Sequence, residues 1–67
     1  MKNKERKILA NKIAKAEWII QHSEDEWEVK KAQMDIMELS GHVDNLDDIT
    51  IIDEMVQEIL KSKKFDN

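Results

Sequence analysis

The side chains that most often do chemistry in proteins are few in this sequence, and their spacing favours structural roles. His22 and His42 lie twenty residues apart in a chain without cysteine, which is not the ligand spacing of a zinc site. Ser23 and Ser40 stand where a helix is expected to begin and to end, and a single glycine excludes a glycine-rich phosphate loop. We therefore expect no enzymatic activity, no bound metal and no cofactor.

An acidic stretch, Asp-Asn-Leu-Asp-Asp at residues 44–48, is similar to a calcium-binding loop only in composition. It lacks the alternating ligand positions, the central glycine and the distal glutamate with which an EF-hand loop surrounds the ion. Short acidic and amide side chains are also the usual caps of helix N-termini. We interpret this stretch as a helix cap within a solvated acidic turn.

Charge is divided unevenly along the chain, whose formal net charge is −4. Residues 1–16 carry six basic residues against one acid, whereas residues 17–60 carry thirteen acids against two lysines. The basic end can neutralise the acidic turn inside an antiparallel fold, which we favour, or it can contact the phosphates of a nucleic acid. The residues that would make such phosphate contacts are Lys2, Lys4, Arg6, Lys7 and Lys12.

The composition and the scarcity of helix-breaking residues predict an all-α protein. The chain of 67 residues is expected to form one domain, residues 1–67, and it has no proline and one glycine. Apolar residues recur at helical spacing in three segments, which predicts helices over about 4–21, 24–40 and 45–62. Because the links between these segments are short, we expect a three-helix up-down-up arrangement, completed by dimerisation.

Local signals mark most of the expected helix ends. Ser23 and Glu26 have the spacing of a capping box at the start of the second helix. Gly41 follows that helix and is expected to adopt the left-handed conformation of a C-terminal cap. Asp44 or Asn45 can cap the third helix, and Thr50 is a further candidate; we favour a start near Asn45.

The two tryptophans are expected to lie away from the aliphatic stripes of their helices. At about 100° per residue, Trp27 and Met34 lie opposite the stripe of the second helix, with Met37 to one side, and Trp18 lies opposite the stripe of the first. Three arrangements remain open. The first and third helices can cover the middle helix on both faces, the two tryptophans can pack against each other over the turn, or these side chains can meet another molecule.

These features favour a small, non-catalytic protein-interaction or regulatory module. A chain this short has little interior, and without cysteine an additional subunit is the remaining means of stabilisation. The expected partner is a second copy in an isologous dimer or another protein, and the alternative is a nucleic-acid-associated accessory protein. The expected protein-contact residues are Trp18, Trp27, Met34 and Met37.

The hydropathy pattern bears on where the protein works. No segment is apolar for long enough to span a bilayer, and no apolar run resembling a signal peptide follows the first residues. We expect a cytoplasmic protein without a membrane partner.

Overall fold

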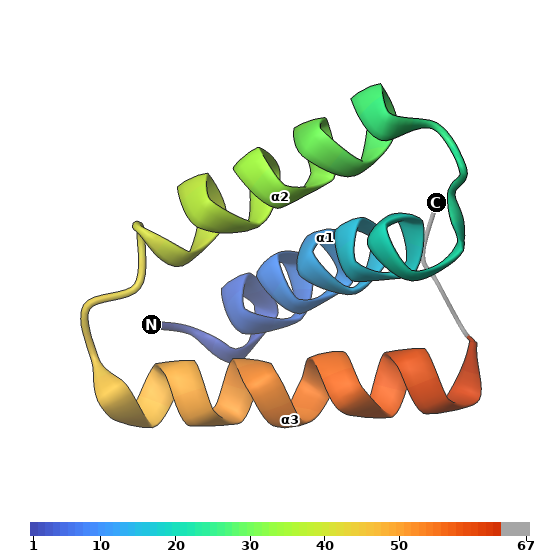
Figure 1. Cartoon of the computed structure of the whole chain (residues 1–67). Helices are drawn as coiled ribbons and strands as arrows, with labels where there is room; N and C mark the ends of the chain where they lie inside the picture. The colour runs from blue at the N-terminus through green and yellow to red at the C-terminus, as the bar shows by residue number, and fades with distance from the viewer. Residues whose placement is uncertain (64–67) are drawn as a thin grey trace.

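Three helices make up the regular structure of the chain. The computed structural model describes residues 1–63, which contain α1 (Asn3–His22), α2 (Glu26–Ser40) and α3 (Leu46–Ser62) in an up-down-up order (Figure 1). The predicted all-α, three-helix fold is therefore confirmed. Within this described part of the chain, none of the helices combines the length and the apolar character that crossing a membrane requires.

The link between α1 and α2 differs from the predicted capping box. The N-cap of α2 is Asp25, whose Oδ1 accepts the Trp27 N–H at 2.9 Å. Ser23 instead terminates α1, because its backbone N–H donates to the Ile19 carbonyl at 2.8 Å. The Ser23 hydroxyl then braces the link, since it accepts the Asp25 N–H at 3.2 Å and donates to Glu28 Oε2 at 2.7 Å. The prediction that Ser23 caps α2 was wrong because the end of α1 already uses that residue.

The end of α2 also differs from the sequence-based expectation. Gly41 has φ −65° and ψ −17°, so it continues the right-handed conformation and does not form the predicted left-handed cap. The chain leaves the helix through successive tight turns, in which the His42 and Val43 N–H groups donate to the Leu39 and Ser40 carbonyls at 3.2 Å. These turns bring Val43 into the core, where it is 9% exposed. The chain therefore leaves α2 without a positive φ at Gly41.

The start and end of α3 follow simple capping rules. Asn45 is the N-cap, as favoured, and its Oδ1 accepts the Asp47 N–H at 2.8 Å. At the other end Lys63 adopts φ 57° and donates its N–H to the Ile59 carbonyl at 2.8 Å. The left-handed cap that was expected after α2 thus occurs after α3, on a residue other than glycine.

The central helix of the fold is α1. Helices α2 and α3 each pack along α1, on two sides of it, and they barely touch each other (Figure 1). The interpretation in which α1 and α3 both cover the middle helix of the sequence is therefore wrong. Small side chains explain why α1 can pack against both α2 and α3. Ala10 and Ala14 are fully buried in the main core cluster, and Ala16 lies on the side of α2. Alanine contacts let helix axes approach closely.

The interior is small even for a chain of this length. The main core cluster consists of Ala10, Ala14, Val43, Ile52 and Val56. Val56 is the only side chain larger than alanine among the described residues that is less than 2% exposed. Longer aliphatic residues such as Leu9, Ile13 and Ile59 pack against the cluster and remain half-buried. One copy of the chain therefore leaves much of its apolar surface incompletely covered.

Candidate protein-interaction surfaces

A strip of three large apolar side chains on α2 faces solvent. Trp27, Met34 and Met37 are 81%, 69% and 75% exposed, and we call this strip the α2 ridge. At 3.6 residues per turn its members fall within an arc of about 80°. Ala32, on the opposite side of α2, is 3% exposed against α1. The sequence thus predicted the direction of these side chains, and neither α1 nor α3 covers them.

Trp18 lies in a different environment from the α2 ridge. Its ring is half-buried near the end of α1, with the His22 ring centroid 3.9 Å away at an interplanar angle of 39° and Lys63 Nζ 6.0 Å from its centroid. Because the indole of Trp27 is 81% exposed, the two tryptophans do not enclose each other. Of the arrangements left open by the sequence, the one in which the two tryptophans pack against each other over the turn is therefore wrong. Trp18 contacts His22 and lies near Lys63, whereas Trp27 faces solvent.

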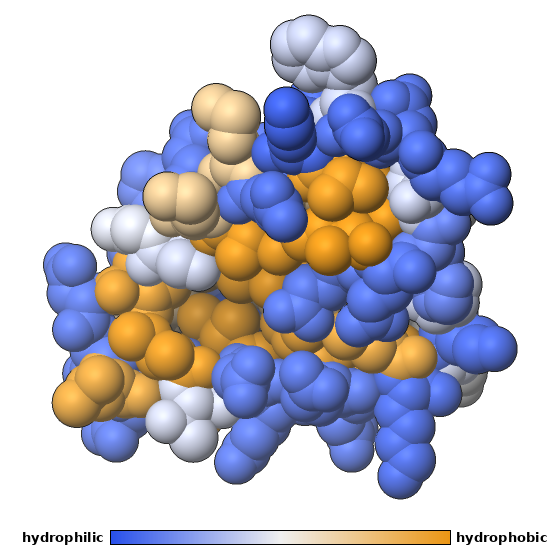
Figure 2. Space-filling view, viewed as in Figure 1, coloured by the Kyte–Doolittle hydropathy of each residue, from blue (hydrophilic) through white to orange (hydrophobic). Residues whose placement is uncertain are grey.

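A groove runs between α2 and α3 with α1 as its floor, and we call it the α2–α3 groove. It has a volume of about 180 Å³, and Figure 2 shows apolar surface extending between these two helices. Its polar lining consists of Glu17, Ser40 and Asp53, without a basic residue. The apolar lining residues, contributed by all three helices and the turn before α3, are Ile13, Ile36, Val43, Ile49, Ile52 and Val56.

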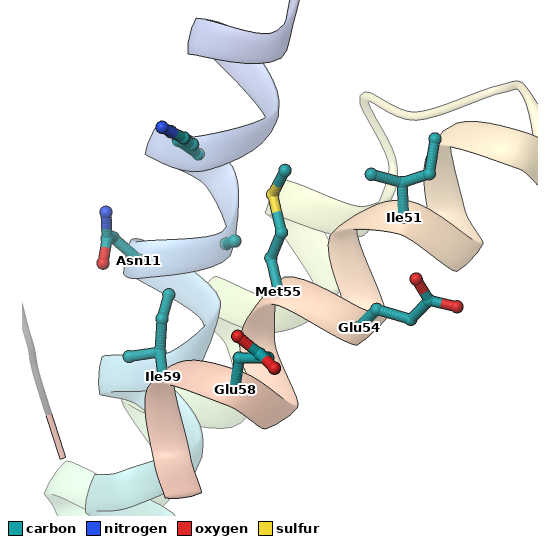
Figure 3. A pocket seen from close by; sticks show the side chains of 8 residues that line it. Asn11, Ile51, Glu54, Met55, Glu58 and Ile59 are labelled. Carbon is teal, nitrogen blue, oxygen red and sulfur yellow. The ribbon is translucent and has the colours of Figure 1, made fainter. Parts of the chain in front are cut away.

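A second groove separates α1 from α3 on another side of the molecule, with a volume of about 540 Å³ (Figure 3). Ile51, Met55 and Ile59 form an apolar line along α3, and Glu54 and Glu58 stand beside it. The α1 side is lined by Lys7, Ala10 and Asn11. Both signs of charge therefore border this groove, whereas only acids border the α2–α3 groove.

The basic N-terminal segment is tied to the acidic segment by one partly buried ion pair. Arg6 Nε and Nη2 donate to Asp48 Oδ1 at 2.9 and 2.7 Å, and the terminal ammonium of Met1 lies 3.9 Å from Asp48 Oδ2. Asp48 is 7% exposed, so the prediction of a wholly solvated acidic turn was wrong at this residue. A usable signal was the spacing of Asp48, Ile52 and Val56, which places the carboxylate on the buried stripe of α3.

The remaining candidate phosphate contacts lie among acids or at the free surface. Lys7 lines the groove that contains Glu54 and Glu58, and Lys12 lines a third groove with Asp35 and Glu38. Lys2 and Lys4 are exposed. The structure therefore does not gather the five basic candidates into one uninterrupted positive surface, and Arg6 is already engaged with Asp48.

Within residues 1–63, no three side chains of the histidine, cysteine, aspartate or glutamate type are grouped closely enough to hold a metal ion. No protein-family model matches the sequence, and no curated protein or solved structure shows significant similarity to it.

Proposed function

We propose that this chain is a small, non-catalytic protein-interaction module that binds through the α2 ridge. The observation that carries the proposal is the exposure of Trp27, Met34 and Met37 on one face of α2. Uncovered strips of large apolar side chains are unfavourable on soluble proteins and commonly mark contact sites. Tryptophan and methionine are enriched at protein interfaces, and the flexible methionine side chain adapts to the shape of a partner.

The surroundings of the α2 ridge support the same proposal. Lys30 and Lys31 lie between Trp27 and Met34 along the helix, and Glu38 follows Met37; all three charged residues are exposed. An apolar centre with a charged border is the usual anatomy of a protein contact, because the border keeps its hydration while the centre loses water.

Because the α2 ridge is exposed, its residues can be replaced to test binding without destabilising the fold. A core tryptophan typically loses about 3–5 kcal/mol of stability when replaced by alanine. Trp27 contacts little of its own chain, so Trp27→Ala should change the unfolding free energy of the monomer by less than about 0.5 kcal/mol. A loss of binding in this variant therefore reports the contact surface and not a damaged fold.

Site-specific photo-crosslinking in the producing cell tests the proposal. The change Met34→p-benzoylphenylalanine places the reactive group within the α2 ridge, and Gln57→p-benzoylphenylalanine places it at an exposed position on α3 as the matched control. We expect a discrete protein adduct from position 34 that disappears when Trp27→Ala is added. Equal adducts from both positions, or no protein adduct from position 34, would contradict the proposal.

A further inference from the structure

We infer that the α2 ridge of one copy packs into the α2–α3 groove of a second copy, forming a two-fold symmetric dimer. This inference rests on the proposed function and names the partner of the α2 ridge. The two surfaces have complementary shapes, since one is a convex line of side chains and the other is a hollow between two helices that barely touch (Figure 2). Helices generally pack by inserting the side-chain ridges of one helix into the grooves between the side chains of another, and the hollow between α2 and α3 offers a ridge a comparable seat.

The α2 ridge is about one helical turn longer than the wall of the groove. From Trp27 to Met37 the α2 ridge advances by ten residue steps, which is about 15 Å at the helical rise. The wall of the groove on α3 extends from Ile49 to Val56, which is about 10 Å. Two turns of the ridge can therefore lie along the groove, and the remaining end of the ridge reaches beyond it.

Charge favours the same pairing. Glu17 and Asp53 line the groove, and neither has an ion-pair partner among residues 1–63. Lys30 lies on α2 between Trp27 and Met34, within the same arc of about 80° as the ridge, and it is also unpaired among these residues. Lys30 stands near the middle of the ridge, and Asp53 stands near the middle of the α3 wall. When the α2 ridge of one copy lies in the α2–α3 groove of the other, Lys30 of the first copy comes close to Glu17 and Asp53 of the second.

The small core explains why a second copy is the occupant. Val56 is the only large side chain that is fully buried within the described residues, while Ile13, Ile36 and Ile49 line a groove open to solvent. In a two-fold arrangement each copy supplies one ridge and one groove, so both grooves are filled and the assembly closes at two chains. An ordinary interface buries about 800 Å² per partner, which is about 15% of the 5359 Å² surface of one copy.

Sedimentation velocity across the micromolar range, with charge-reversed variants, tests this pairing. We expect the wild-type chain to dimerise, and we expect Lys30→Glu to raise the Kd at least about tenfold because it places like charges together. Asp53→Lys should have a similar effect, and the double variant should return the Kd to within about threefold of wild type. Lys61→Glu is the matched control: it makes the same charge change at an exposed residue of α3 that lines none of the three grooves, and it should change the Kd less than about threefold.

A disulfide test gives an independent readout, because the chain contains no cysteine. Mixing the Lys30→Cys and Asp53→Cys variants under mild oxidation should form a mixed dimer faster than mixing Lys61→Cys with Asp53→Cys. Equal rates, or a double charge-reversed variant that is not rescued, would overturn the ridge–groove pairing.

The outcomes also separate this inference from the proposed function. A wild-type chain that is monomeric throughout the micromolar range overturns the inference, while a Trp27-dependent crosslink from position 34 to a different protein leaves the proposed function standing. A dimer whose Kd is unchanged by Trp27→Ala with Met34→Ala also overturns the inference, and the proposed function fails with it if position 34 gives no Trp27-dependent adduct.

Discussion

Replacing Arg6 with methionine should destabilise this fold more than any other single change among its N-terminal basic residues. The guanidinium donates twice to Asp48 Oδ1, at 2.9 and 2.7 Å, and the Asp48 side chain is only 9% exposed. Methionine retains a long apolar stem, but it leaves a nearly buried carboxylate without its principal partner. The cost comes mainly from that unpaired charge, because water cannot fully solvate it.

The loss of unfolding free energy in Arg6→Met should be smaller than the loss caused by breaking a fully buried ion pair. Breaking a buried ion pair by removing one partner costs about 3–5 kcal/mol. Arg6 is 24% exposed, and the Met1 ammonium remains 3.9 Å from Asp48 Oδ2, so part of the charge stays compensated. We expect a loss of about 2–3 kcal/mol for Arg6→Met. For a domain of this size that loss lowers the Tm by about 10–20 °C.

Thermal unfolding followed by far-UV circular dichroism measures the loss, at one fixed protein concentration because self-association would add concentration-dependent stability. Lys7→Met, which removes the next basic side chain along α1, is the control and should change stability by less than about 0.5 kcal/mol. Arg6→Met combined with Asp48→Leu should recover most of the loss, since no unpaired charge remains. A loss below about 0.5 kcal/mol for Arg6→Met, or a double variant no more stable than the single one, would refute this reasoning.

Three further changes test the local structure and the charge distribution. Asp25→Ala should cost about 1 kcal/mol in urea unfolding, because it removes the side chain that accepts the Trp27 N–H at the start of α2; an unchanged midpoint would contradict that cap. Gly41→Ala should stabilise the fold by about 0.5 kcal/mol in the same assay, because φ is −65° and an added Cβ meets the Glu38 carbonyl oxygen at an ordinary 3.4 Å; a destabilised variant would show that glycine is required there. If Lys4 and Lys7 contact phosphates, Lys4→Glu with Lys7→Glu should abolish retention on a nucleic-acid column, and retention that persists rejects that role.

Features that depend on neighbouring residues along the chain were predictable from the sequence. Asn45 caps α3 because its side chain reaches an N–H only two residues away, whatever the rest of the fold does. The outward direction of Trp27 and Met34 follows from helical periodicity once Ala32 marks the opposite, buried face. Both inferences required only the spacing of residues within one helix.

Two local signals were misassigned because each had a close competitor. Ser23 and Asp25 are both good capping residues, and the choice between them depends on where α1 ends, which the Ser23 N–H bond to Ile19 decides. Gly41 tolerates a left-handed conformation but does not require it. The turns that carry Val43 into the core keep this glycine right-handed.

By itself the sequence determined the number of helices, their approximate extents and the outward face of α2, because periodicity and capping act over a few residues. Only the tertiary structure decided that α1 is the central helix, that Arg6 meets Asp48 across 42 residues of chain, and that a groove lined by Glu17 and Asp53 stays open between α2 and α3. An apolar stripe indicates that one face of a helix is buried, but it does not identify the helix that packs against that face. That choice depends on how closely Ala10 and Ala14 let the axes approach, and on which charges then come within reach of each other.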